Sequence, residues 1–153
     1  MQTIQATLEV FIMNIAFKEY YYLLAQIDSA YHEAAVKLGI TDSELDILYS
    51  LSIHGSGCNQ SIFYKETGTT KSTINSSVRK MEKAGILYLK PGSGRNTCVF
   101  LTQDGELLLK NTVHKIIQIE NEIFESWSKD EQQMFMQLNR DFAKKFEEKI
   151  QDL

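Results

Sequence analysis

The sequence has little proline and cysteine, and it has no long apolar run. One Pro and eight Gly among 153 residues leave room for long uninterrupted helices, because these two residue types are the usual helix breakers. No stretch of about 18 apolar residues occurs, so no membrane partner is expected. The only two cysteines, Cys58 and Cys98, are too few for a disulfide framework and fit a reducing, cytoplasmic location. The N-terminus has no basic segment before an apolar run, so a secretory signal is not expected either.

Motifs of the common enzyme classes are also missing. The sequence has no His-Glu-x-x-His, no P-loop, no Gly-x-Ser-x-Gly and no dinucleotide fingerprint. We therefore expect no enzymatic activity, no catalytic residues and no cofactor. His54 and Cys58 are close in the sequence, but a metal site needs three or four ligands, so no metal is expected.

Acidic residues outnumber basic ones, which at first argues against a nucleic-acid partner. The formal net charge is −4, yet the segment 59–100 holds seven basic and two acidic residues and so carries +5. The remainder must then carry −9. Such a division indicates that one face meets an anion while the rest of the surface repels it.

Apolar residues recur at helical spacing from Thr7 to Val36, which predicts a long first helix that ends at Gly39. Thr41 and Glu44 form a capping box, which predicts a second helix that stops near His54. Asn59 is expected to cap a helix of about two turns, Gln60–Glu66. After a glycine, Thr69 or Thr70 caps another helix, Lys71–Ala84. The last two helices, joined by a tight turn, form the pattern of a helix-turn-helix.

Two strands, Ile86–Leu89 and Thr97–Leu101, are predicted next, with turn-forming residues between them. Thr102 is expected to cap one long helix that reaches about Phe124, and a second capping box at Ser128 begins the final helix. The predicted fold class is mainly α with a small β-hairpin wing, that is, a winged helix-turn-helix with additional N- and C-terminal helices.

The helix Lys71–Ala84 has two different faces. Ile74, Val78 and Met81 lie on one stripe that should face the core. The opposite face carries small polar residues first and cations later: Ser72, Asn75, Ser76, Arg79 and Lys83. Such a face suits a helix in the major groove, where Ser and Asn bond base edges or phosphates and Arg bonds guanine or phosphate. The alternative is an ordinary solvated helix face.

The predicted hairpin carries Arg95 near its tip and Lys90 at its base. An Arg on a glycine-rich loop can reach the minor groove, where narrow A·T segments concentrate negative potential. The alternative is a surface turn with incidental charge.

Four segments together resemble the MarR family of transcription regulators. They are Thr70–Asn75, Met81–Leu87, Gly94–Arg95 and Val99–Gly105. The resemblance implies a homodimer that binds a palindromic operator in double-stranded DNA, usually as a repressor released by a small-molecule effector. The implied division is 1–38 for an N-terminal dimerisation helix, 39–102 for the winged DNA-binding domain and 103–153 for C-terminal dimerisation helices.

The resemblance also implies which residues form the sites. The expected DNA-binding residues, including those read from the helix and wing patterns, are Thr70, Lys71, Ser72, Thr73, Asn75, Ser76, Arg79, Lys90 and Arg95. Tyr20 and Tyr22 are candidates for an effector pocket between the dimer arms and the winged domain, although an aromatic core is the alternative.

The sequence departs from the family pattern at three places. Ser93 replaces the usual wing Asp, Ser76 stands where an Arg is frequent, and Asn96-Thr97 lacks a second wing cation. Fewer cations predict weaker DNA affinity and a shallower dependence on salt.

Two other functions remain open from the sequence. The small number of cations on the predicted wing and the negative net charge of the chain allow a winged-helix protein-interaction module without DNA binding. A cysteine redox switch on the same fold is the other. Cys58 is expected at the start of the third helix, where backbone amides would lower its pKa.

Overall fold

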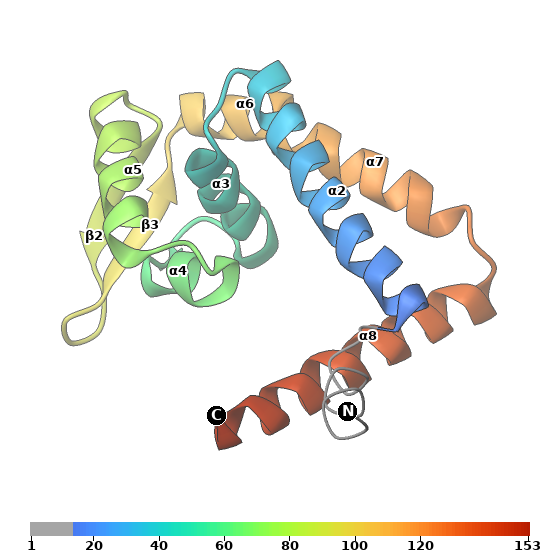
Figure 1. Cartoon of the computed structure of the whole chain (residues 1–153). Coiled ribbons are helices and arrows are strands. Elements are labelled where there is room, and N and C mark those ends of the chain that lie inside the picture. The colour runs from blue at the N-terminus through green and yellow to red at the C-terminus, as the bar shows by residue number, and fades with distance from the viewer. Residues whose placement is uncertain (1–13) are drawn as a thin grey trace, which may run out of the picture.

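A computed structural model describes residues 14–153 (Figure 1), so the part of the predicted first helix before Asn14 lies outside the described residues. The elements in chain order are α2 (Ile15–Leu38), α3 (Asp42–His54), β1 (Cys58–Asn59), α4 (Ser61–Thr67), α5 (Lys71–Lys83), β2 (Leu87–Pro91), β3 (Thr97–Leu101), α6 (Gln103–Asn111), α7 (Val113–Glu125), α8 (Lys129–Lys149) and a short 3₁₀ helix (Ile150–Asp152). The fold is mainly helical with a small sheet, as predicted. Within 14–153, no helix is both long enough and apolar enough to span a bilayer.

Local signals set the helix ends. The capping box at Thr41 is present, with the Glu44 amide bonded to the Thr41 hydroxyl and the Glu44 carboxylate accepting from the Thr41 amide. The second capping box joins Ser128 and Glu131 in the same way at the start of α8. Gly39 ends α2 with φ +72°, a left-handed conformation that costs other residues a steric penalty. These three predictions are confirmed.

Within the part of the chain that the structure describes, the sheet has three strands instead of the two that were predicted. The strand order is β1-β3-β2, all antiparallel, and Cys58 pairs with Val99 while Leu89 pairs with Val99 from the other side. The prediction that Cys58 begins the third helix was therefore wrong. Two residues are too few to show the alternating pattern by which a strand is recognised. Asn59 still accepts from the Ser61 amide at 2.9 Å, so it fixes the start of α4 one residue later than expected.

The hydrophobic core lies between α3, α5, the sheet and the start of α7. Ile74, Val78 and Met81 of α5 are buried in it, as the stripe on this helix predicted. Their fully buried neighbours include Ile47, Leu48, Leu51, Phe63, Leu87, Val99 and Val113. Burial on one side fixes α5 in rotation, so its polar face must point to solvent.

The predicted long helix after Thr102 is wrong, because the chain breaks into α6 and α7 at Thr112. Thr112 has φ −120° and ψ −86°, and its hydroxyl donates to the Leu108 carbonyl at 2.7 Å. A threonine that bonds back to the preceding turn competes with the helical hydrogen bonds and bends the chain. The bend turns α7 away from the wing and toward α2.

The helices outside the winged domain form an extended arm (Figure 1). Helices α2 and α7 run away from the domain, and α8 crosses beneath the N-terminal end of α2. Contact between α8 and α2 is aromatic, since the ring centroids of Phe17 and Phe142 are 5.5 Å apart and Tyr20 lies against Phe142 at 5.9 Å.

Gly105 in the first turn of α6 permits a close approach between this helix and Ile86, the residue before β2. A Cβ atom at Gly105 would lie 2.2 Å from the Ile86 carbonyl oxygen. We expect Gly105→Ala to destabilise the protein by about 1–3 kcal/mol, because a backbone atom must move to admit the methyl group. Helix propensity alone would give the opposite sign, by roughly 1 kcal/mol. Urea unfolding measures the difference, with the exposed neighbour Glu106→Ala as the control; an equally stable Gly105 variant would contradict the expectation.

Candidate nucleic-acid interface

Helix α5 is held with its polar face outward by bonds at both ends. The Thr70 hydroxyl accepts from the Thr73 amide and so caps the helix start. Toward the other end, Lys80 pairs with Glu44 of α3 at 3.1 Å, and Ser77 bonds Ser43 at 2.6 Å. Burial opposes ionisation of Glu44, but the Thr41 amide and the Lys80 ammonium together lower the pKa of its carboxyl.

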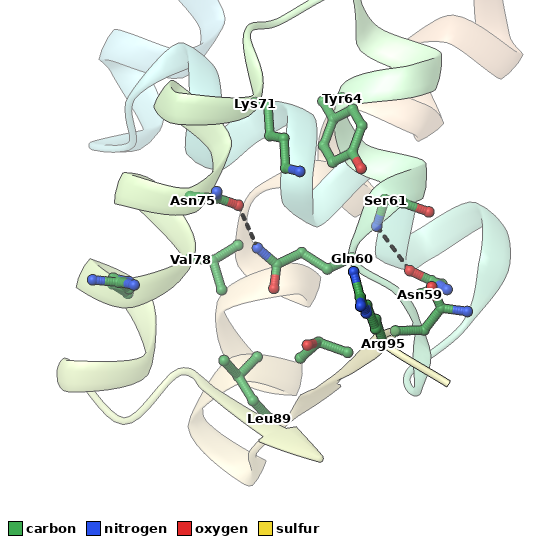
Figure 2. Close-up of a pocket in the computed structure, with 12 residues that line it drawn as sticks. Asn59, Gln60, Ser61, Tyr64, Lys71, Asn75, Val78, Leu89 and Arg95 are labelled. Carbon is green, nitrogen blue, oxygen red and sulfur yellow. Dashed lines mark hydrogen bonds between the residues drawn. The ribbon is translucent and has the colours of Figure 1, made fainter. Parts of the chain in front are cut away.

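A concave surface of about 360 Å³ lies between α5, the start of α4 and the wing (Figure 2). Most of the side chains that line it are polar or basic. The lining residues are Asn59, Gln60, Ser61, Tyr64, Lys71, Asn75, Val78, Arg79, Leu89, Arg95, Asn96 and Thr97. We call this concave surface the α5–wing surface.

Three cations from two elements converge on the α5–wing surface. Lys71 and Arg79 come from α5, and Arg95 comes from the turn between β2 and β3. The Lys71 ammonium lies 5.7 Å from the centre of the Tyr64 ring, which is within the range of a cation–π contact. Within residues 14–153, no acidic residue lines this surface, so it has the charge of an anion site.

Lys80 and Lys90 contact groups that lie outside the α5–wing surface. Lys80 is directed to Glu44, and the Lys90 ammonium lies 5.2 Å from the centre of the Phe100 ring and 5.5 Å from that of Tyr88. Tyr88 and Phe100 stack on each other at 5.1 Å. Lys90 is therefore placed over an aromatic pair on the wing and is not among the residues that line the α5–wing surface.

The wing turn is closed by the backbone and leaves Arg95 exposed. The Gly92 amide donates to the Asn96 carbonyl at 2.8 Å, and Gly94 has φ +64°. Only the glycine takes this left-handed conformation without a penalty. The turn thus directs Arg95 back toward α5 without fixing its side chain.

The structure separates the expected DNA-binding residues other than Lys90, which lies over the aromatic pair of the wing, into three groups. Lys71, Asn75, Arg79 and Arg95 are brought together on the α5–wing surface. Ser72, Thr73 and Ser76 are exposed on α5, and the Thr70 hydroxyl is occupied with its cap. Whether each contacts DNA stays a prediction.

Sequence reasoning missed the residues that α4 and β1 contribute. Gln60, Ser61 and Tyr64 line the α5–wing surface, and Asn59 was expected only as a helix cap. The one available signal was their position inside the basic segment 59–100. Their convergence with α5 depends on the pairing of β1 with β3, which the sequence did not reveal.

Cys58 does not have the surroundings that a reactive thiol needs. It lies in β1, half-buried, and burial raises the pKa of its thiol. The expectation of a lowered pKa at a helix start was therefore wrong, because the residue is in a strand. A raised pKa leaves less thiolate at neutral pH, which disfavours the redox switch.

Tyr20 and Tyr22, the two candidate effector residues, point to different surroundings. Tyr20 lines a groove of about 510 Å³ between α2 and α8, next to Phe17 and Phe142. Tyr22 is 60% exposed and lies against Tyr21, and it is not among the residues that line this groove. The groove is mostly apolar, so Tyr20 is placed in an aromatic cluster.

A third hollow, a cavity of about 390 Å³, lies where α2, α3 and α7 meet, and sequence reasoning did not find it. Its lining residues are Asp28, Tyr31, Leu45, Asp46, Tyr49 and Glu120. Glu120 of α7 accepts hydrogen bonds from both Tyr31 of α2 and Tyr49 of α3. The bond from Tyr49 connects the arm to the winged domain, and the bond from Tyr31 joins two helices of the arm.

The same two bonds predict an alkaline titration. Burial, the hydrogen bond to Glu120 and its negative charge raise the pKa of Tyr31 from 10.0 to about 12, and they raise the pKa of Tyr49 as well. Both pKa values are higher in the folded state, so the stability they contribute is complete below pH 10 and is lost as the pH rises to about 12 and above.

We expect Glu120→Gln to lower both pKa values only in part, since burial, the largest cause, remains. Ultraviolet absorbance of tyrosinate should show the late-titrating tyrosines shifted to lower pH. Glu122→Gln, which removes an exposed carboxylate on the same helix, is the matched control. Superimposable curves for the Glu120 variant and the unmodified protein would contradict the assignment.

Helix α5 has a buried apolar stripe and a polar outer face, and a short helix precedes it. The hairpin that follows α5 returns an Arg to the same polar face. This arrangement defines a winged helix-turn-helix protein. Residues 38–95 match the model of the MarR family, so the resemblance seen in the sequence is confirmed. None of the curated proteins matches the sequence.

Solved structures with the same fold cover most of the chain. The MarR family regulator NMB1585 from Neisseria meningitidis is 16% identical with a TM-score of 0.76, and the alignment covers 92% of this chain and 99% of that one. The PcaV transcriptional regulator from Streptomyces coelicolor, in complex with its natural ligand, is 20% identical with a TM-score of 0.63, covering 87% and 96%. A MarR family regulator from Rhodococcus sp. RHA1 is 18% identical with a TM-score of 0.63, covering 86% and 96%. The chain has the fold of these regulators.

Proposed function

We propose that this protein is a transcription regulator that binds specific DNA sequences as a homodimer. The observation that carries the proposal is the convergence of Lys71, Arg79 and Arg95 with Asn75 on one concave surface, which no carboxylate of the described residues lines. Cations supply sequence-independent attraction to phosphates, and an amide and guanidinium groups supply contacts to base edges. An isolated basic patch would supply only the first.

The shape of the surface supports a helix in the major groove with the wing beside it. Ser72 and Ser76 are small and exposed, so the first half of α5 can approach the base edges closely. Arg95 belongs to the turn between β2 and β3. This turn extends past the N-terminal end of α5 (Figure 1), which suits contact with the neighbouring minor groove or its phosphates.

The apolar residues that a single copy leaves exposed support a homodimer. They concentrate on α2, α7 and α8, where Ile123 is 54%, Leu138 58% and Phe146 56% exposed. Large exposed apolar surfaces usually mark interfaces. Two copies related by a twofold axis would present two α5 helices to successive major grooves of a palindromic operator.

Repression relieved by a small molecule is the mode of action that we propose for the dimer. The similarity to PcaV, whose structure holds its natural ligand, supports an effector. The cavity at Tyr31, Tyr49 and Glu120 is a suitable place, because a ligand there would separate α7 from α2 and α3 and so change the angle of the arm. Asp28, Asp46 and Glu120 make this cavity unfavourable for an anion.

Selection of bound duplexes from a genomic fragment library tests the proposal directly. We expect enrichment of fragments that share a twofold-symmetric motif, among them DNA upstream of the gene itself. Light scattering should give the mass of a dimer. Flow-through from a nonspecific DNA column at low salt, with no fragment enriched, would overturn the proposal and favour the protein-interaction module.

A further inference from the structure

One side-chain hydrogen bond controls the only amide that α5 contributes to the α5–wing surface. Gln60 Nε2 donates to Asn75 Oδ1 at 2.7 Å (Figure 2). Both side chains are half-buried and line the α5–wing surface. The bond joins the residue before α4 to the middle of α5.

Gln60 is itself anchored through its backbone, so its side chain reaches Asn75 from a fixed position. Its backbone amide donates to the Thr97 carbonyl of β3 at 2.8 Å, and its carbonyl accepts from the Phe63 amide at 3.2 Å. The first bond continues the pairing of β1 with β3. The wing strand therefore fixes the position from which Gln60 reaches Asn75.

The polarity of this bond decides what Asn75 presents to solvent. An asparagine side chain has one acceptor oxygen and one nitrogen with two donors. Because the oxygen already accepts from Gln60, it is less available to an outside partner than the nitrogen, whose two hydrogens both remain free to donate. The usual contact of Asn with adenine is bidentate and uses both atoms, since the oxygen accepts from adenine N6 while the nitrogen donates to N7. That pair is therefore disfavoured here.

We propose that Gln60 is a specificity-determining positioning residue that makes Asn75 a hydrogen-bond donor toward DNA. The inference rests on the proposed DNA-binding function. Asn75 then prefers base edges that offer acceptors, namely guanine O6 and N7 or thymine O4, over the bidentate pair with adenine. Gln60 contacts no base in this role and acts through Asn75.

A purely structural role for the same bond predicts a different result. A hydrogen bond of this kind contributes modestly to stability, and α4 and α5 are also joined through buried Phe63 and Ile74 and by Lys71 over Tyr64. A structural role would change the melting temperature and affect all DNA sequences equally. A positioning role changes the base preference at one position of each half-site.

Gln60→Glu tests the polarity. The introduced carboxylate only accepts, so Asn75 must turn its nitrogen inward and present its oxygen to DNA. In selection from randomised duplexes, we expect the preference at the Asn75 position to shift from guanine or thymine toward adenine or cytosine, by roughly tenfold. Asn75→Ala locates that position, because it should lose the preference there and nowhere else.

Two further variants separate the effect of the direction of the Gln60–Asn75 hydrogen bond from the effect of the negative charge that Gln60→Glu adds. Asn96→Asp adds a negative charge on the same surface, so it should lower overall affinity and leave the preference at the Asn75 position unchanged. Gln60→Leu adds no charge and frees Asn75, so it should admit adenine at that position. Melting temperatures of all variants show that they fold.

The outcomes are distinct. If the unmodified protein selects no duplex, the proposed function fails and this inference fails with it. If it selects a motif but both Gln60 variants keep the same preference at the Asn75 position, or if Asn75→Ala changes no position, the DNA-binding function stands and the positioning role of Gln60 is overturned.

Discussion

Replacing Arg79 and Arg95 with alanine is expected to weaken specific DNA binding by about 1–3 kcal/mol for each Arg that contacts a base. Both guanidinium groups line the α5–wing surface, one from the helix and one from the wing. If the two contacts are independent, the losses in the double variant should approach their sum. An Arg that contacts only phosphate should instead weaken all sequences alike and lower the salt slope by about one.

The sequence supplies a matched control for this experiment. The third Arg of the chain, Arg140, is exposed on α8, away from the α5–wing surface, and Arg140→Ala removes the same charge. Fluorescence anisotropy over a series of salt concentrations measures affinity and slope together. We expect Arg140→Ala to bind within a few tenths of a kcal/mol of the unmodified protein. Equal losses for Arg140 and Arg79 would mean that overall charge, and not the α5–wing surface, governs binding.

Agreement between sequence and structure was best where a single residue's chemistry decides the conformation. Thr41 and Ser128 begin helices because each hydroxyl accepts a hydrogen bond from the backbone amide three residues later. A motif of four consecutive residues is enough to predict this bond. Gly39 and Gly85 end helices at positive φ for a similarly local reason. The buried stripe of α5 could be predicted because helical periodicity fixes which side chains share a face.

Features that depend on distant partners were the ones missed. Strand β1 exists only because β3 offers it hydrogen bonds, and Cys58-Asn59 has no strand signal of its own. The break at Thr112 is the exception, because its cause is the local bond from the Thr112 hydroxyl to the Leu108 carbonyl. It falls inside an apolar pattern that continues through it, so periodicity alone predicted one helix. The site again depends on distant partners. The cations of α5 and the wing were predictable, but Gln60 joins them only because β1 places it opposite Asn75.

The second large effect, a loss of stability, is expected from a substitution in the hydrophobic core beneath the α5–wing surface. Phe63 of α4 is 0% exposed, and we expect Phe63→Ala to lower the free energy of unfolding by about 3–5 kcal/mol. Domains of this size are commonly stable by only about 5–15 kcal/mol, so the variant should be marginally folded. Urea unfolding measures the loss. Phe63→Leu, which keeps most of the apolar volume, should lose much less, and equal losses for both variants would contradict a packing cause.

DNA should restore part of that stability, because it is expected to bind the folded state and because Phe63 is buried and is not among the residues that line the α5–wing surface. Operator DNA at a hundredfold its Kd is expected to return about 2.7 kcal/mol in the unfolding experiment. The Kd of the folded Phe63→Ala fraction should then be close to normal, whereas Arg79→Ala should unfold normally and bind weakly. A Phe63 variant that binds weakly even when fully folded would show that α4 shifts and carries Gln60 and Asn75 out of position.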